Sequence, residues 1–251
     1  MGIPGFDVFE LDIESALRRD LPPFIERFHA ASLIEENINR IPPKTNGVYL
    51  LFRGDEVKYV GKTTAKKGFH ARLSRHAFHF RHRKNVEPGT ISFKAISIPV
   101  FHVADIEKIL IRHFNAEWNN SGIGSNDTGK NRDTQKVADF DLQYSVNPDI
   151  PLEIIQAGSI ECKEILDKIK KYVPYTFRYE RKINQSDLRT EINIPFDNLN
   201  LREVLQLIVN SLPHKVWQAT IFHGRVILYP ETIDYIHSQD ILRPQPEPHN
   251  P

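Results

Sequence analysis

The chain has 251 residues, of which 40% are hydrophobic and 26% charged, and its formal net charge is +1. This composition fits a globular protein of one large or two small domains. The single cysteine, Cys162, excludes an intramolecular disulfide and a cysteine-rich zinc site. The sequence contains no stretch of about 18 apolar residues, so it predicts no membrane span. The first residues lack the pattern of a signal peptide, so we expect a cytoplasmic protein with no membrane partner.

The positive charge is concentrated in one segment. Between Val57 and Val86 there is no Asp or Glu, and nine cationic side chains occur. Because the whole chain carries +1, the rest of the chain carries −8. Charge runs are usually solvated helix faces, but nine cations without an acid favour a surface that contacts phosphates.

Residues 1–46 predict an N-terminal helical collar. Apolar side chains at near-helical spacing indicate one helix over residues 7–20 and a second over residues 23–40. The pair Pro22-Pro23 is expected to separate these two helices, because proline removes a backbone donor and collides with the preceding turn.

Residues 47–147 predict a core that contains both strands and helices. β-prone residues on both sides of Gly54-Asp55 indicate a hairpin over residues 47–61, and a third strand is expected over residues 90–100. Helices are expected over residues 68–82 and 105–116, and a polar, glycine-containing loop follows as far as residue 133.

The remaining residues predict a second, small α+β domain over residues 148–240. An internal repeat with a period of 39 relates the segment 163–174 to the segment 202–213, and each copy reads strand, helix, proline, strand. A hairpin that turns at His223-Gly224 follows. The last residues contain four prolines, so residues 241–251 are expected to be a disordered tail.

Three side chains in the core have the properties that phosphodiester hydrolysis needs. Arg72 and His76 are four residues apart, so they share one helix face, where the arginine can clamp a phosphate and the histidine can move a proton. Glu107 falls on the apolar stripe of its helix, where a carboxylate must be paired or bind a metal. Each residue alone has a simpler interpretation as a solvated or ion-paired side chain.

Taken together, the motifs resemble those of the GIY-YIG nuclease superfamily, in the form found in its type II restriction endonucleases. The resemblance spans about residues 47–133, and its elements occur in the family's order: Gly47-Val48-Tyr49, Tyr59-Val60-Gly61, Arg72 with His76, Glu107, and Asn119. The following loop, residues 124–133, resembles the restriction-enzyme loop, although Thr128 stands where the family usually has proline. The resemblance implies a three-stranded antiparallel sheet flanked by helices.

The resemblance also implies catalytic roles. Tyr49 would deprotonate the attacking water or relay its proton, with assistance from His76. Tyr59 would hold the water or the phosphate. Arg72 would stabilise the charge of the transition state.

Glu107 would bind one Mg²⁺, for which Mn²⁺ can substitute, and Asn119 would tie the core together. The reference pKa of tyrosine is about 10. We therefore expect Lys62 and Arg72, together with the metal, to lower the pKa of Tyr49. DNA contacts are expected from the following residues: Lys62, Lys66, Lys67, Arg75, Arg81, Arg83, Lys84, Asn126 and Arg132.

The mechanism makes one demand on the hairpin. A regular hairpin with a two-residue turn at Gly54-Asp55 pairs Tyr49 with Val60, which puts Tyr49 and Tyr59 on opposite faces of the sheet. The shared active centre needs both on one face. We therefore predict an odd-length loop or a β-bulge in this hairpin.

The leading interpretation is a metal-dependent DNA endonuclease of restriction or defence type, which would cut a palindrome as a homodimer. The C-terminal domain would supply dimerisation, specificity or a partner contact. Three alternatives remain open. They are a nicking or structure-specific repair nuclease, a catalytically silent DNA-binding protein, and a zinc protein that uses His76, His79 and His82.

Overall fold

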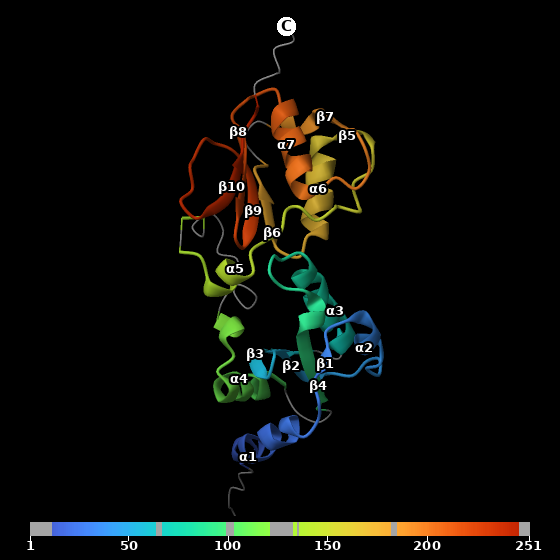
Figure 1. Cartoon of the computed structure of the whole chain (residues 1–251), viewed down its shortest axis with the longest axis vertical. Helices are drawn as coiled ribbons and strands as arrows, with labels where there is room; N and C mark the ends of the chain where they lie inside the picture. Colours follow the sequence, from blue (N-terminus) through green and yellow to red (C-terminus); the bar gives the residue numbers. More distant parts are fainter. Residues whose placement is uncertain are drawn as a thin grey trace, which may run out of the picture. The chain divides into compact units, whose positions relative to one another are not determined.

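The computed structural model describes residues 12–63, 67–98, 103–120, 133–134, 136–181 and 185–245. The chain divides into two compact units, residues 1–74 with 89–117 and residues 75–88 with 118–251. Each unit combines helices with a sheet (Figure 1), as the sequence predicts. The division differs from the predicted boundary near residue 147, because residues 118–147 and the second half of the basic helix group with the C-terminal unit.

The first unit contains a four-stranded antiparallel sheet with the strand order β1-β4-β2-β3. Its strands are β1 (Ala31–Ser32), β2 (Gly47–Arg53), β3 (Glu56–Lys62) and β4 (Ile91–Ser97). The predicted hairpin and third strand are confirmed. The expectation of three strands was wrong, because the two-residue strand β1 pairs with Ser92 and Phe93 of β4.

The hairpin contains the predicted β-bulge. Arg53 pairs with Glu56 across a two-residue turn, but the register shifts after the pair Phe52 and Val57, so that Leu51 lies opposite Tyr59 and Tyr49 lies opposite Gly61. Lys58 is the extra residue. Since side chains two residues apart on a strand share a face, the shift brings Tyr49 and Tyr59 to the same face of the sheet.

The N-terminal helices differ from the prediction. The first helix, α1 (Ile13–Glu26), continues through Pro22 and Pro23, and the second, α2 (Glu35–Asn39), is short. Leu21 and Ile25 explain the continuity, because both are buried against the sheet and their burial offsets the hydrogen bonds that the prolines remove. Packing against a distant strand therefore overrides the local helix-breaking tendency.

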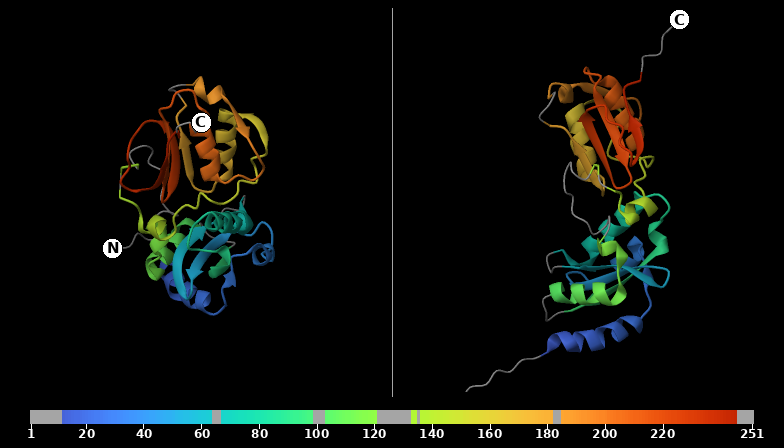
Figure 2. Two further views of the ribbon diagram at one scale, coloured as in Figure 1. Left: turned by 45° about the horizontal axis from the view of Figure 1, so that its top comes forward. Right: turned by 90° about the vertical axis from the view of Figure 1, so that its left-hand side faces the viewer.

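Two further helices flank the first sheet, α3 (Gly68–Arg81) and α4 (Val103–Phe114), and a short 3-10 turn η1 (Pro88–Thr90) precedes β4. Both helices confirm the predicted elements. α1 and α4 cover the same face of the sheet (Figure 2), where Ile106 and Leu110 join Val48 and Leu50 in one apolar core. The opposite face carries Tyr49 and Tyr59.

The second unit contains two successive segments of strand, helix and strand, in the region where the sequence predicts a repeat. Its first copy consists of β5 (Gly158–Glu161), α6 (Cys162–Tyr172) and β6 (Thr176–Tyr179). Its second copy consists of β7 (Glu191–Ile194), α7 (Leu201–Ser211) and β8 (Trp217–Phe222). β5 and β7 form a two-stranded sheet. The remaining elements are η2 (Glu117–Asn120), α5 (Asp139–Gln143), η4 (Asp187–Arg189), β9 (Arg225–Pro230) and β10 (Ser238–Leu242).

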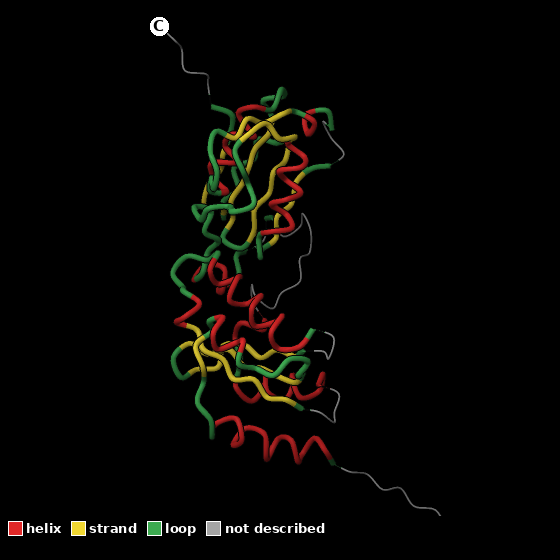
Figure 3. Tube along the Cα trace, turned by 90° about the vertical axis from the view of Figure 1, so that its right-hand side faces the viewer, coloured by secondary structure: helices red, strands yellow, loops and turns green. Residues whose placement is uncertain are grey.

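The larger sheet of this unit has the order β10-β8-β9-β6 and is antiparallel except for the parallel pair β6 and β9. The helices α6 and α7 contribute to the same apolar core as this sheet (Figure 3). β10 ends at Leu242, so residues 241 and 242 of the segment expected to be a disordered tail belong to a strand, and residues 246–251 lie outside the described residues. Within the described ranges, no helix has both the length and the apolar character to cross a membrane.

Candidate active site

The two signature tyrosines form a contacting pair. Their ring centroids lie 6.0 Å apart with the ring planes inclined by 41°. Tyr49 is 1% exposed, whereas Tyr59 is half-buried. Gly61 lies directly opposite Tyr49, and a methyl group at Gly61 would overlap the Tyr49 ring. The glycine of the Tyr-Val-Gly motif therefore leaves room for the Tyr49 ring to lie across β3.

Replacing Gly61 by alanine should separate the tyrosine pair. The new methyl group overlaps ring atoms of Tyr49 in a site where the neighbours are close-packed, so the ring must move. We expect a destabilisation of about 1–3 kcal/mol and a loss of any activity that needs the pair. Urea unfolding and cleavage assays on the same preparation test this. Replacing Gly89 by alanine is the matched control, since its backbone φ is not positive and its added carbon meets only Cγ2 of Ile34, at the ordinary contact distance of 3.9 Å.

Arg72 presents an unused donor near the tyrosines. It lies half-buried on α3, and its charge acts on the phenols of both Tyr49 and Tyr59. Its Nε atom is buried and has no hydrogen-bond partner among the described residues. A buried guanidinium N–H without an acceptor costs free energy, and a phosphate oxygen supplies the missing acceptor.

Glu107 of α4 also acts on both tyrosines electrostatically. Its side chain is 20% exposed, and one carboxylate oxygen lies 2.9 Å from Nζ of Lys62. The sequence predicted that Glu107 must be paired or bind a metal, and the structure gives it a lysine partner at the end of β3. Arg72 and Glu107 therefore both act electrostatically on the tyrosine pair, and Lys62, which lies opposite Val48 on the face that α4 covers, pairs with Glu107. These five residues are called here the tyrosine site.

The donor set of the tyrosine site fits only a sparsely ligated metal. Within the described ranges, no group of three or more His, Cys, Asp or Glu side chains could hold a metal ion. A single carboxylate suits Mg²⁺, which keeps several waters and takes substrate phosphate oxygens as further ligands. A metal at Glu107 would share this carboxylate with Lys62, whose Nζ lies 2.9 Å from Oε2.

Without the metal that the expectation includes, the pKa of Tyr49 lies above its ordinary value. Burial raises the pKa of Tyr49 well above its ordinary value, and the interaction with Tyr59 raises it further, while Arg72 opposes the shift without overcoming it. Burial also raises the pKa of Tyr59. The hydrogen bond between the phenols raises the pKa of Tyr49 and lowers that of Tyr59, as expected when Tyr49 donates to Tyr59. Both phenols are therefore neutral at pH 7 in the metal-free protein.

These shifts predict a loss of stability in alkali. The folded-state pKa of Tyr49 lies above its ordinary value of 10.0. The neutral phenol therefore contributes its full stability to the folded state below about pH 10, and this contribution is lost as the pH rises through the folded-state pKa. The free energy of unfolding should fall above about pH 10, and less steeply in Tyr49→Phe. Urea unfolding at several alkaline pH values measures both slopes. Identical slopes would contradict the assignment.

His76 and Asn119 belong by contacts to the other compact unit. His76 follows Arg72 by one turn of α3 and is half-buried, and Asn119 is half-buried in η2. Their catalytic and structural roles stay predictions. His79 and His82 each have Nδ1 near a backbone carbonyl, at 3.3 Å from Pro174 and 2.9 Å from Phe78, which gives the zinc interpretation no support.

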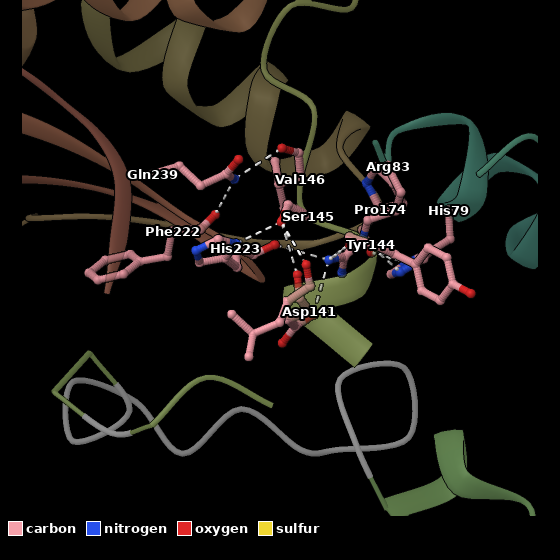
Figure 4. A network of polar contacts seen from close by, with 11 residues as sticks. His79, Arg83, Asp141, Tyr144, Ser145, Val146, Pro174, Phe222, His223 and Gln239 are labelled. Carbon is pink, nitrogen blue, oxygen red and sulfur yellow. Dashed lines mark hydrogen bonds and ion pairs between the residues drawn. The ribbon is translucent and has the colours of Figure 1, made fainter. Parts of the chain in front are cut away.

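The expected DNA-contacting cations fall into three groups. Lys67, Arg75 and Arg81 are exposed, while Lys62 and Lys84 are half-buried and contact Glu107 and Gln239. Arg83 corrects the prediction, because it is buried and its guanidinium bonds with protein groups (Figure 4), so it cannot reach a DNA phosphate. The remaining three lie outside the described residues: Lys66, Asn126 and Arg132.

The sequence analysis missed one residue that shapes the tyrosine site. Thr63 is buried, its Oγ1 accepts a hydrogen bond from the Gly47 amide at 3.0 Å, and its own amide donates to the Gly47 carbonyl at 2.9 Å. These bonds fasten the outer ends of β2 and β3, which carry the two signature motifs. The available signal was a β-branched hydroxyl residue directly after the second motif.

The comparisons with known proteins add no family assignment. No protein-family model matches the chain, and no curated protein matches it either. The case for function therefore depends on the motifs and on the geometry of the tyrosine site.

Proposed function

We propose that this protein is a metal-dependent DNA endonuclease of the GIY-YIG type. The observation that carries the proposal is the tyrosine site, in which a contacting tyrosine pair, one carboxylate and a buried arginine donor that has no partner among the described residues occur together. These groups match what phosphodiester hydrolysis requires, namely proton transfer, a cation at the phosphate and a metal ligand. The exposed cations Lys67, Arg75 and Arg81 supply a surface for the DNA backbone.

In this proposal each side chain of the tyrosine site has a separate role. Arg72 donates its Nε–H to a phosphate oxygen and stabilises the negative charge of the transition state. The neutral, buried Tyr49 fits a proton relay better than a free base, since it donates to Tyr59 and Tyr59 is closer to solvent. Glu107 holds the metal, which supplies positive charge at the leaving oxygen. Lys62, released from Glu107, remains close by as a second cation for the phosphate.

Cleavage of supercoiled plasmid with Mg²⁺ or Mn²⁺ tests the proposal, with Glu107→Ala as the inactive variant. We expect cleavage by the wild type and a loss of at least about 10²-fold in the variant, because Glu107 is the carboxylate that the proposal assigns to the metal. Glu56→Ala is the matched control, since Glu56 is an exposed acid paired with Lys58 in the same unit. Equal activity of wild type and Glu107→Ala would refute the assignment.

The products separate the nuclease classes. Discrete fragments of genomic DNA indicate a restriction enzyme with a defined site, and a dimer in solution is then expected. Nicked circles without linear plasmid indicate a nicking or repair nuclease instead.

One observation favours a catalytically silent DNA-binding protein as a second candidate. The Lys62 ammonium already neutralises the Glu107 carboxylate, which is the position that the metal needs. If the pair is permanent, the wild type binds DNA in a salt-dependent way and cuts in neither metal. Under the nuclease proposal, Lys62→Met leaves Glu107 available and lowers the Mg²⁺ concentration needed for half-maximal cleavage.

A further inference from the structure

A pocket of about 430 Å³ lies at the edge of the sheet in the first unit. β1 covers β4 only at Ser92 and Phe93, so among the described residues no strand covers the outer edge of β4 from Lys94 onward. Three of the β4 residues that line the pocket, Phe93, Ala95 and Ser97, alternate onto one face. Ala95 is the direct cross-strand partner of Tyr49. Part of the pocket lining therefore shares a face of the sheet with the tyrosine pair, whereas Lys94 lines the pocket from the opposite face.

Aromatic rings form the apolar part of the lining. Phe69 and Phe93 are buried at 2% and 5% exposure, and the half-buried Phe28, which lies against Lys94, lines the pocket as well. These rings come from α3, from β4 and from the segment after α1, so the fold gathers them from three distant parts of the sequence. Aromatic faces of this kind bind nucleobases without requiring a particular sequence.

Two cations and one imidazole line the pocket. The pocket is lined by His29, Arg40 and Lys94, and no Asp or Glu is among its lining residues. Lys94 is fixed in place, since its Nζ donates to the Ile25 carbonyl at 2.8 Å and lies 5.4 Å from the centre of the Phe28 ring. Arg40 pairs with Glu36 at 2.6 Å, but both side chains are about 70% exposed, so this bond is weak and can be exchanged.

We propose that this pocket holds a single unstacked nucleotide of the DNA that the tyrosine site cuts, with its base against the aromatic rings and its phosphate at Arg40. The proposal rests on the nuclease function. The volume lies in the range of small-ligand sites, and a base can enter a pocket only after it leaves the duplex stack. An extended peptide is disfavoured, because strand addition uses a long open edge and only Lys94 to Ser97 are open here.

Nucleotide binding to the full-length chain, without metal, tests the proposal. The probes are the four deoxynucleoside 5′-monophosphates, inorganic phosphate and a capped acidic tetrapeptide, followed by calorimetry or by amide chemical shifts. We expect nucleotides to bind at least about tenfold more tightly than inorganic phosphate, because each 1.4 kcal/mol of base stacking gives a factor of ten. Arg40→Gln should weaken nucleotide binding about tenfold, because a charge-assisted hydrogen bond is lost.

Arg27→Gln is the matched control, since Arg27 is an exposed arginine next to Phe28 that does not line the pocket. Equal weakening in both variants, equal affinity for inorganic phosphate, or tighter binding of the peptide would each overturn the proposal. Glu107→Ala separates this inference from the proposed function, because Glu107 does not line the pocket. If the wild type binds nucleotides but does not cut plasmid, the nucleotide pocket is supported and the nuclease function is refuted. If it cuts plasmid but does not bind nucleotides, the nuclease function is supported and the nucleotide pocket is refuted.

Discussion

Replacing Arg72 by alanine is expected to lower the rate of DNA cleavage about 10³-fold while DNA affinity changes little. The reason is the position of the guanidinium, whose Nε is buried without a partner and whose charge acts on Tyr49 and Tyr59. A donor preorganised in a buried site stabilises charge that develops in the transition state far more than it stabilises the bound substrate. The measurement is the single-turnover cleavage rate at saturating protein, beside a separate DNA-binding titration.

Arg75→Ala provides the contrast on the same helix. Arg75 is exposed, so it can contribute only a solvated contact to the DNA backbone. We expect weaker binding, a decrease of about one in the slope of log affinity against log salt concentration, and an unchanged saturated rate. If Arg72→Ala behaved like Arg75→Ala in both assays, Arg72 would only contact the DNA backbone. The tyrosine site would then have no residue assigned to stabilise the charge of the transition state.

Arg72→Lys separates charge from geometry. Lysine keeps the positive charge but lacks the planar fork of donors, and its ammonium group is more strongly hydrated. A rate between those of the wild type and Arg72→Ala is expected if both charge and direction matter. Full restoration would show that charge alone is sufficient.

Local patterns in the sequence predicted most elements of the fold. The hairpin, the basic helix α3, the strand β4 and the repeat of the second unit follow from hydrophobic periodicity and turn residues, which act over a few positions. The bulge at Lys58 was predicted differently, from the demand that Tyr49 and Tyr59 share one face. That demand is functional, and no feature of the local sequence specified where the extra residue would lie.

The errors have a common physical origin in contacts between distant residues. The break expected at Pro22 and Pro23 does not occur, because Leu21 and Ile25 are buried against strands that come 20 or more positions later. β1 is too short to have a pattern and exists through its pairing with β4. Local propensities cannot reveal either effect.

The same limit applies to the tyrosine site. The order of the motifs selected its members, but their electrostatic state depends on burial, which the sequence does not display. Lys62 and Arg72, together with a metal, were expected to lower the Tyr49 pKa. In the protein without metal, Lys62 contacts Glu107, and desolvation of the phenol is the largest influence on this pKa. Counting charges along the chain also placed Arg83 on the DNA surface, because its partner Asp141 lies 58 positions away.

Arg83→Ala is expected to lower the free energy of unfolding by about 3–5 kcal/mol, since it breaks a buried ion pair. Nη1 of Arg83 donates to Asp141 at 3.0 Å and to the Tyr144 and His223 carbonyls at 2.9 and 3.1 Å (Figure 4). Its Nε donates to Nε2 of His79 at 3.2 Å. Burial holds the pKa of His79 well below its ordinary value, so this imidazole is neutral and can accept. The alanine variant leaves the Asp141 carboxylate buried without its cation.

Urea unfolding of Arg83→Ala, Arg81→Ala and the double variant Arg83→Met/Asp141→Leu measures this effect. Arg81 is exposed two residues away, so its removal should change stability by less than about 0.5 kcal/mol. The double variant should cost less than Arg83→Ala, because two apolar side chains leave no unpaired charge. Should Arg83→Ala instead keep full stability and weaken DNA binding as much as Arg81→Ala does, Arg83 would belong to the DNA-contacting surface after all.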